Sequence, residues 1–432
     1  MKPFNYTRRR NKKGGIPIFA GAQGCVFKPS LKCKNQIRNY HDGNISKLCE
    51  RISAESEMRE FAQIKRHLVR IKNYNKFFGI KAHLCEPDVL DHNDLENFDE
   101  VCVNMKEHKI TAANVNANLN RLRMINMPDL GIDLTKWIEQ TELNSQQIQK
   151  LNNHISTLLV NAVEPMNRLG VIHNDLKSEN VMIDAKEDVR IIDWGLAGIS
   201  TEHQVIPLQH FMYNPVSFNR PFSTMIISPT SVEMYASTFL NQPQMPSLNQ
   251  VKQFTRGLYK KYIESYNMIG YNYLEYIFMS IFGLNEKNAT EFLVDSVANY
   301  NADILYHFTD SATQTFRLNE YFRTIYRYNT DIWGLMSIFY SIFMLPRVRF
   351  VMSNKSYANM LHRYRALFRS IVFVNGHKRM NVPNILHHLR EINNALDKNK
   401  KKTVQFTARA NMRKSIKRIP TPHPHKIKII AL

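Results

Sequence analysis

The sequence predicts an α+β fold in two parts, a small strand-rich part followed by a larger helical part. Up to about residue 135, short apolar runs of strand character (Ile16–Phe19, Cys25–Lys28 and Asn44–Leu48) accompany one charged helix. From Asn144 onward, apolar residues recur at spacings of three and four, which is the period of an amphipathic helix. With 432 residues, of which 44% are hydrophobic and 22% charged, the chain can bury a full core.

Two amphipathic helices are expected, one in each part. The first spans about residues 53–72, and the second runs from Asn144 to near Gly170, a residue type that often terminates helices. Two short strands, Val181–Ile183 and Val189–Ile192, follow the second helix around a polar turn. The apolar residues that share one face of the first helix are Phe61, Ile64, Leu68 and Ile71.

The chain is strongly basic, and basic residues concentrate at its two ends. It carries 58 Lys and Arg against 37 Asp and Glu, a net charge of +21. Residues 1–14 are a basic arm that no apolar run follows, unlike a secretory signal. Residues 398–432 contain eleven Lys or Arg and no acidic residue, so we expect a disordered tail. Such a tail would bind nucleic acid or an acidic protein through charge, or serve only as a solubilising end.

The five cysteines all lie in the first quarter of the chain, between Cys25 and Cys102. Their number is odd and no Cys-x-x-Cys pair occurs, so we expect buried free thiols rather than a disulfide framework or a zinc site. Free thiols in turn indicate a reducing compartment. The longest apolar stretch, Ile332 to Leu345, is shorter than the about 20 residues of a membrane helix. We therefore expect a soluble intracellular protein without a membrane span.

A polar loop between apolar runs carries the most specific chemical signal. In the segment VIHNDLKSENVMI, the long helix leads into a loop that presents Asp175, Lys177 and Asn180, and Asp193 ends the next apolar run. Phosphoryl transfer needs a carboxylate for the proton of the attacking hydroxyl, oxygen ligands for magnesium, and a cation near the γ-phosphoryl group. Asp175 can fill the first role, Asn180 with Asp193 the second, and Lys177 the third. The pattern therefore predicts a phosphoryl-transfer site.

This segment resembles the catalytic loop of protein kinases. The run HNDLKSEN, which ends at Asn180, is similar to the HRDLKxxN motif of that family, and DWG, which begins at Asp193, is similar to DFG. The intervals from Asp175 to Asn180 and from Asn180 to Asp193 also match the family pattern. The resemblance implies an ATP-dependent serine/threonine protein kinase that transfers the γ-phosphate to protein hydroxyls. Asp175 would be the catalytic base, and Asn180 and Asp193 would hold Mg²⁺.

The same resemblance implies a bilobal protein-kinase-like fold. Residues 15–131 would form a small β-rich N-lobe, and residues 132–397 a larger helical C-lobe. The interval from Asp193 to Asp331 is far longer than is usual in the family, so a helical insertion is expected at about residues 222–325.

Upstream of the loop, the run FAGAQGCV looks like the glycine-rich loop of protein kinases, with Phe19 in place of the first glycine. The run NISKL is similar to the VAIK strand, which implies that Lys47 pairs with the α and β phosphates. A glutamate on the following helix should hold this lysine, and Glu60 is slightly favoured over Glu57. The residues implied in nucleotide binding are Gly21, Ala22, Gln23, Gly24, Val26, Lys47, Glu60 and Asp193.

Three further positions follow from the resemblance. Residues 124–131 would form the hinge that meets adenine, and Asp133 would lie near the ribose. The run TDIWGL resembles the DxWSxG start of the buried central helix, so Asp331 would accept hydrogen bonds from the catalytic-loop backbone. Asn174 stands where the family has an arginine that pairs with an activation-loop phosphate, so we expect no need for that switch.

The combination resembles the serine/threonine kinases of large nucleocytoplasmic DNA viruses. The shared features are the runs GAQGCVFKP, ISK, DWG and NRPFS. A viral origin would imply host cytoplasm, viral factories or virions as the location. Two alternatives remain open. A small-molecule phosphotransferase of the choline or aminoglycoside kinase type also uses a His-x-Asp loop, although Lys177 favours protein substrates. A non-catalytic nucleotide-binding scaffold is the other, although all the groups needed for catalysis are present.

Overall fold

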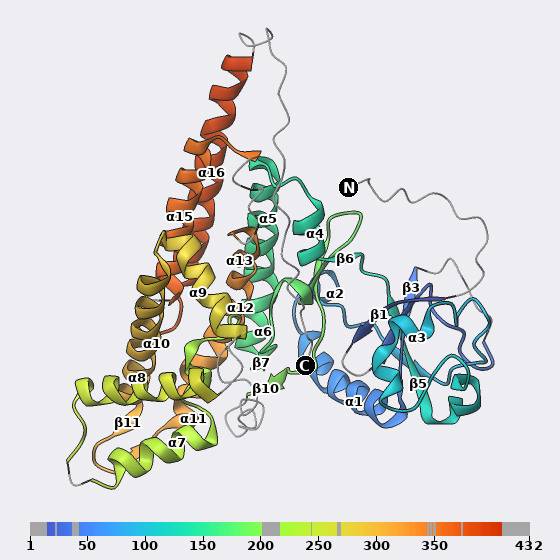
Figure 1. Ribbon diagram of the computed structural model, residues 1–432, viewed down its shortest axis with the longest axis horizontal. Helices are drawn as coiled ribbons and strands as arrows, with labels where there is room; N and C mark the ends of the chain where they lie inside the picture. Colours follow the sequence, from blue (N-terminus) through green and yellow to red (C-terminus); the bar gives the residue numbers. More distant parts are fainter. Residues whose placement is uncertain are drawn as a thin grey trace. The chain divides into compact units, whose positions relative to one another are not determined.

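The computed structural model describes most of the chain between residues 15 and 407 (Figure 1). The basic arm 1–14, Ala22, Gln23 and residues 408–432 of the predicted tail lie outside the described residues. The described ranges are 15–21, 24–36, 43–200, 217–242, 244–265, 269–343, 345, 348, 351–372 and 375–407.

The chain forms two compact units. One contains residues up to 62 and 80–129, and the other contains residues 63–79 and 130–404. The chain passes between them after Asp129, within the predicted hinge at residues 124–131. The first unit is built on a sheet and the second is mainly helical, which confirms the predicted α+β architecture with a β-rich N-terminal part and a helical C-terminal part.

The first unit contains a five-stranded antiparallel sheet in the order β1-β2-β3-β5-β4. Its first three strands coincide with the apolar runs in the sequence. In register, Val26 lies opposite Lys47, and Lys47 lies opposite Ile125. Lys47 is thus fixed in the middle of the sheet. The strands are β1 (Ile16–Gly21), β2 (Gly24–Lys28), β3 (Asn44–Glu50), β4 (His83–Cys85) and β5 (Leu122–Pro128).

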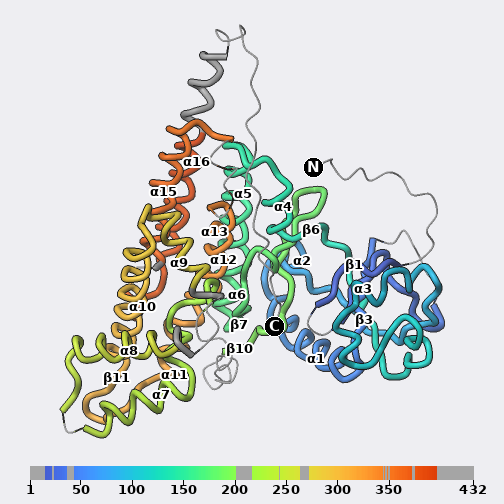
Figure 2. Tube along the Cα trace, in the orientation of Figure 1, coloured from blue at the N-terminus to red at the C-terminus, as the bar shows by residue number. Residues whose placement is uncertain are grey.

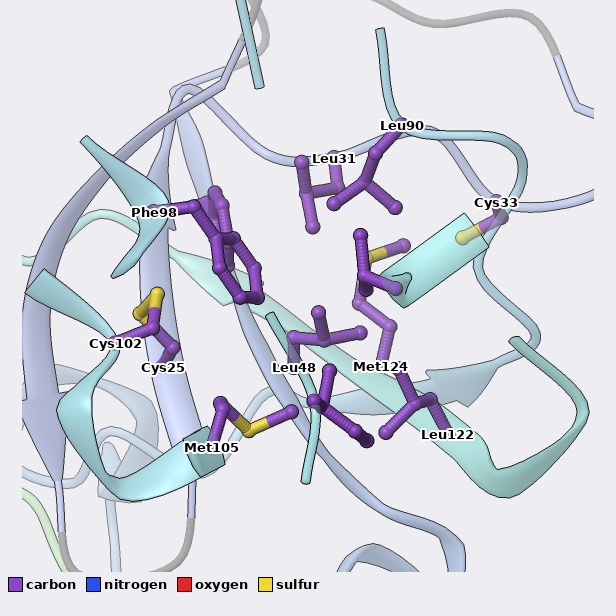
Figure 3. Packing of buried hydrophobic residues seen from close by; sticks show 13 residues of the cluster. Cys25, Leu31, Cys33, Leu48, Leu90, Phe98, Cys102, Met105, Leu122 and Met124 are labelled. Atoms are coloured by element: carbon purple, nitrogen blue, oxygen red, sulfur yellow. A yellow bond between two sulfur atoms is a disulfide. The ribbon is translucent and has the colours of Figure 1, made fainter. Parts of the chain in front are cut away.

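A hydrophobic cluster joins this sheet to the segment between β4 and β5 (Figure 3). Phe27, Leu48 and Met124 from the sheet are fully buried, and they cluster with Phe98 and Met105 from that segment. Burying one side chain of this size contributes about 1.5–3 kcal/mol. The segment contains α3 (Phe98–Val101) and the 3₁₀ helices η1 (Val103–Lys106) and η2 (Val115–Arg121).

Two disulfides cross this unit, and they overturn the prediction of free thiols. One joins Cys25 in β2 to Cys102 after α3 (Figure 3), and the other joins Cys33 to Cys85 in β4. Cys49 alone is a free, buried thiol. Spacing along the chain could not reveal these pairs, because the folded sheet brings together cysteines that are 77 and 52 residues apart. The inference of a reducing compartment rested on free thiols and loses that support.

Helix α1 (Arg51–Leu68) follows β3 without a loop. It begins two residues before the predicted start, and Ile64 and Leu68 on its apolar face are buried. The short helix α2 (Tyr74–Phe77) comes next, and Phe78 then pairs with Ile191 as an isolated bridge.

In the second unit, the predicted long helix is present from Ser145 to Arg168 (Figure 2). The Asn144 side chain accepts hydrogen bonds from the first turn, so it caps the helix. The helix contains one π turn, just before Pro165, whose missing N–H and ring disturb regular α-helical hydrogen bonding. Its three parts are α5 (Ser145–Leu158), η3 (Leu159–Val163) and α6 (Glu164–Arg168).

Short strands on either side hold the polar loop that follows this helix. The strands β6, β8 and β9 form one small sheet, and β7 pairs with β10. The loop of residues 173–180 therefore starts and ends at hydrogen-bonded backbone. The bounds are β6 (Ile132–Asp133), β7 (Val171–Ile172), β8 (Val181–Ile183), β9 (Val189–Ile191) and β10 (Gly198–Ile199), and α4 (Leu134–Gln140) follows β6.

The predicted insertion is helical. Helix α10 (Glu286–Phe308) packs against α8 (Leu248–Ser265) and α9 (Ile269–Phe282) (Figure 1). The Thr255 hydroxyl on α8 donates to the Ala298 carbonyl on α10 at 2.9 Å. The other elements of the insertion are η6 (Phe222–Met225), α7 (Pro229–Tyr235), η7 (Ala236–Leu240), the hairpin β11 (Thr309–Asp310) with β12 (Thr315–Phe316), α11 (Leu318–Tyr321) and η8 (Phe322–Tyr326).

After the predicted insertion, the described residues include the helices α12 (Arg327–Ser337), α13 (Tyr340–Phe343), α15 (Asn354–Val372) and α16 (Val382–Thr407). Helix α16 continues ten residues into the segment 398–432, which was predicted to be disordered, so its start at residue 398 is corrected. Binding of nucleic acid or acidic protein by that segment stays a prediction. No helix in the described part of the chain has both the length and the apolar composition of a membrane span.

The disulfide arrangement predicts the thiol count of the purified protein. Denatured without reductant, the chain should react with one equivalent of a thiol reagent, at Cys49, and with five after reduction. In the folded protein, burial raises the pKa of Cys49 to about 12, so alkylation at pH 8 should be slow. The variant Cys102→Ser should gain one further thiol, that of Cys25. Five reactive thiols before reduction would contradict both disulfides.

Candidate active site

A buried carboxylate on α12 holds the backbone of the polar loop. Asp331 Oδ2 accepts from the His173 N–H at 2.9 Å, and its Oδ1 accepts from the Asn174 N–H at 2.9 Å. The Asn167 side chain also donates to Oδ2, at 2.7 Å. Full burial raises the pKa of the Asp331 carboxyl, while His173 and these donors act in the opposite direction. The predicted role of Asp331 as a support of the loop is confirmed.

The loop turns sharply at Asn174, which has a φ of 62°. Asparagine is among the few side chains that tolerate this left-handed conformation. Asn174 is buried, and its Oδ1 accepts from the Tyr326 hydroxyl at 2.8 Å. Burial raises the pKa of Tyr326, so the hydroxyl remains a neutral donor. The residue that replaces the family's arginine is thus tied into the core.

Nitrogen donors from three residues surround the Asp175 carboxylate. Its Oδ2 receives Asn180 Nδ2 at 3.0 Å and lies 3.1 Å from Lys177 Nζ. Its Oδ1 receives Asn219 Nδ2 at 2.8 Å. Asn180 Nδ2 also donates to the Asp175 carbonyl at 2.8 Å. The structure therefore brings Asp175, Lys177 and Asn180 together, and it adds Asn219, which sequence reasoning missed.

Asp193 is positioned by the residue before it. The Ile192 N–H donates to the Asn180 carbonyl at 3.0 Å, and the Ile192 carbonyl lies 2.8 Å from His173 Nε2. A carbonyl can only accept, so Nε2 carries the proton, and Nδ1 accepts from the Asp175 N–H at 3.3 Å. Asp193 itself is exposed and has a φ of 62°. These contacts place it next to the strand end that carries Asn180.

The next residue, Trp194, fixes this turn from the other side. Its ring packs against His173, with centroids 4.8 Å apart, and against Phe78 at 5.7 Å. Trp194 is buried while its neighbour Asp193 is exposed. The left-handed backbone at Asp193 thus lets the Trp194 ring pack in the core while the Asp193 carboxylate faces solvent.

In the first unit, Lys47 pairs with Glu57. Lys47 Nζ lies 2.7 Å from Glu57 Oε2. The slight preference for Glu60 was wrong, because Glu60 lies on an exposed part of α1 and accepts from Ser56. The face of α1 that packs inward decides between the two glutamates. Ala54, which is buried one turn before Glu57, marks this face and could have indicated Glu57 in the sequence.

The predicted glycine-rich loop is the hairpin between β1 and β2, where Gly21 pairs with Gly24. A side chain at Gly24 would lie 2.6 Å from the Leu48 carbonyl, so only glycine fits. Asn104 Nδ2 donates to the carbonyls of Gly21 and Gly24, the second at 3.1 Å. Cys25, the next residue, carries the disulfide to Cys102. Nothing in the sequence pattern around Asn104 pointed to this contact.

Asp133 and a group of cysteines near His83 have simpler structural roles. Asp133 caps α4, where its side chain accepts from the Lys136 N–H at 2.9 Å, and its contact with ribose stays a prediction. Within the described ranges, Cys33, His83 and Cys85 group closely enough to share an ion. The two sulfurs are bonded to each other, so this group is not a metal site.

Residues 100–216 match the family model of the protein kinase domain. The chain is 40% identical over 67 residues to serine/threonine-protein kinase ppk35 of Schizosaccharomyces pombe, which covers 15% of this chain and 11% of that protein. It is 28% identical over 141 residues to CBL-interacting serine/threonine-protein kinase 17 of Arabidopsis thaliana. This alignment covers 32% of this chain and 28% of that protein. These comparisons support the protein kinase superfamily.

A third relative is the hormonally up-regulated neu tumor-associated kinase of Mus musculus, which is 34% identical over 71 residues. This alignment covers 16% of this chain and 8% of that protein. The chain thus spans less than a third of the length of each of these kinases. The matched kinase domain segment contains Asp175, Lys177, Asn180 and Asp193, whereas the glycine-rich hairpin and Lys47 precede it. The matches support a domain of the protein kinase fold, and the kinase activity and the resemblance to viral kinases stay predictions.

The contacts of Asp331 predict a large effect on stability. Replacing Asp331 with alanine leaves the N–H groups of His173 and Asn174 buried without an acceptor, which should lower the free energy of unfolding by about 3 kcal/mol. All three tryptophans lie in the second unit, so their fluorescence during urea unfolding reports on it. The control Asp295→Asn breaks an exposed ion pair with Arg256 and should cost under about 1 kcal/mol. Equal losses in both variants would contradict the supporting role of Asp331.

Proposed function

We propose that this chain is an ATP-dependent serine/threonine protein kinase with Asp175 as its catalytic base. The observation that carries the proposal is the convergence of Lys177, Asn180 and Asn219 on the Asp175 carboxylate. The three contacts fix the orientation of the Asp175 carboxylate. The side chain nevertheless keeps 19% of its surface exposed, so part of it can still contact a substrate.

Asp175 can orient the hydroxyl of a protein substrate. A carboxylate has about four lone-pair positions. The three contacts leave acceptor capacity for the hydroxyl of an incoming serine or threonine. Because the neighbouring donors fix the side chain, the carboxylate is aimed before substrate arrives, and such preorganisation lowers the barrier to transfer.

Asn180 and Asp193 supply the donor set that Mg²⁺ prefers. Asn180 Nδ2 donates to two oxygens of Asp175, which leaves Asn180 Oδ1 as the atom available to a cation. Asp193 adds an exposed carboxylate, held near Asn180 through Ile192. Hard oxygen ligands of this kind suit magnesium. When bound, magnesium neutralises phosphate charge on ATP.

Lys177 provides the positive charge of the site. Its Nζ lies 3.1 Å from Asp175 Oδ2, and its side chain is 30% exposed. A cation beside the base can meet the negative charge that develops on the transferred group. The choice of serine and threonine over tyrosine rests on this lysine, through the family resemblance. Two of the similar proteins are named serine/threonine-protein kinases, which agrees with this choice.

The first unit supports the ATP assignment on its own geometry. Glu57 fixes the Lys47 ammonium, which would meet the α and β phosphates. In the glycine-rich hairpin, at the start of β2, the absence of a side chain at Gly24 lets the backbone approach the Leu48 carbonyl, which would lie 2.6 Å from a Cβ there. Lys47, opposite Val26 in the register, lies on the strand next to this hairpin. Backbone N–H groups and one lysine are the usual parts of a triphosphate cradle.

Transfer of radiolabel from ATP to a generic basic protein tests the role of Asp175. The variants Asp175→Asn and Asp193→Asn should each lower kcat by about 10²–10⁴-fold, because one loses the base and the other a metal ligand. The exposed Asp295→Asn variant should keep the wild-type rate. Equal incorporation in all proteins would rule out the site. Transfer only to choline or an aminoglycoside would favour a small-molecule kinase, and nucleotide binding without transfer would favour a scaffold.

A matched pair of variants tests the lysine contact. Glu57→Gln should lower kcat/KM for ATP about tenfold, because it frees Lys47 from its carboxylate partner, and tenfold corresponds to about 1.4 kcal/mol. Glu60→Gln, one turn away on the same helix, should leave kcat/KM within about twofold. Steady-state kinetics with varied ATP measures both. A larger loss in Glu60→Gln than in Glu57→Gln would reverse the assignment.

A further inference from the structure

Asn219 contacts the proposed base from outside the matched kinase segment, which ends at residue 216. It is 2% exposed. Its Nδ2 donates to Asp175 Oδ1 at 2.8 Å and to the Leu176 carbonyl at 3.2 Å. Both acceptors belong to the polar loop, so one amide group joins the base to its own backbone.

The orientation of this amide is determined by its surroundings. Asp175 Oδ1 and the Leu176 carbonyl can only accept hydrogen bonds, so the NH₂ group must face them. On the other side, the Ser217 hydroxyl donates to Asn219 Oδ1. A flipped amide would set its oxygen against two acceptors, which makes the observed orientation the only one that satisfies all three contacts.

Helix α12 holds the segment that carries Asn219. Trp333 Nε1 donates to the Phe218 carbonyl at 3.1 Å. A Cβ at Gly334 would lie 2.6 Å from the Leu176 carbonyl and 3.1 Å from the Asn219 carbonyl, so the absence of a side chain lets both backbones approach the helix. Phe222 then packs edge-on against Trp333, with ring centroids 5.0 Å apart. The segment around Asn219 is therefore packed into the core against α12.

We propose that Asn219 is a positioning residue that fixes the Asp175 carboxylate for phosphoryl transfer, and that it does so without any modification of the chain. The proposal rests on the proposed kinase function. Asn180 and Lys177 fix one carboxylate oxygen, and Asn219 fixes the other. Because the donor is a buried neutral amide rather than a phosphorylated side chain, its contact with the base does not depend on a phosphate.

The substitution Asn219→Asp separates this role from a general packing role. It keeps the shape of the side chain but places a second carboxylate against Asp175 Oδ1. Repulsion between the two carboxylates favours protonation of one of them. The acid limb of the kcat/KM profile should therefore move upward by about one pH unit or more. A residue with only a packing role would not move this limb.

The experiment uses full-length, phosphatase-treated protein. Asn219→Ala should lower kcat about 10–100-fold with the KM for ATP changed less than about twofold, because orientation is lost while nucleotide contacts remain. Asn219→Asp should show the displaced acid limb. The exposed Asn241→Asp is the matched control and should behave as the wild type. Wild-type kcat and pH profile in both Asn219 variants would overturn the proposal, as would a wild type that transfers phosphate only before phosphatase treatment.

A further variant guards against misfolding. Ser217→Ala removes the hydroxyl that fixes the amide orientation without touching Asp175, so kcat should fall several-fold while the tryptophan fluorescence transition stays in place. An unchanged kcat in Ser217→Ala together with unfolding of both Asn219 variants would assign Asn219 a structural role only. A wild type without any transfer activity would instead overturn the proposed function, and this inference with it.

Discussion

The proposed site depends on one buried carboxylate. Asp331 is fully buried on α12, and a carboxylate in that environment is tolerated only when its oxygens are hydrogen-bonded. The backbone N–H groups of His173 and Asn174 provide these hydrogen bonds from a loop about 160 residues earlier in the chain. The requirement acts in both directions: the helix needs the loop to satisfy its charge, and the loop needs the helix to hold a left-handed turn. Asp175 follows directly, so its position is set by the same interaction.

The polar loop could be predicted from sequence because its functional groups are local. Asp175, Lys177 and Asn180 lie within six consecutive residues, and the two paired strands that follow, β8 and β9, span the interval to Asp193. The contacts that were missed are tertiary. A lone asparagine at position 104 or 219 has no periodic pattern, and its role appears only when distant backbone comes within hydrogen-bond distance.

Two wrong predictions in the first unit have the same physical origin. The cysteine pairs depend on which strands are neighbours, and β4 joins the sheet beside β5 rather than beside β3. The choice of Glu57 over Glu60 depends on which face of α1 packs on the sheet. One outcome of this packing is a glycine-rich hairpin held both by Asn104 and by the disulfide of the next residue. A unit of this size buries a smaller share of its surface than a large domain does, and covalent links of this kind add about 2–4 kcal/mol each.

The predicted insertion is connected to the site through α12. Its last described turn, η8, ends at Tyr326 and runs directly into α12. Tyr326 donates to Asn174, Trp333 holds the segment of Asn219, and Asp331 holds the loop between them. The donors in the first two contacts are uncharged, and the third uses backbone N–H groups. The order around Asp175 thus follows from burial and hydrogen bonding in the folded core. In the family that the sequence resembles, an arginine in the place of Asn174 pairs with a phosphate instead. Tyr326, at the end of the predicted insertion, supplies the hydrogen-bond partner of Asn174, the residue that stands where the resembled family has that arginine.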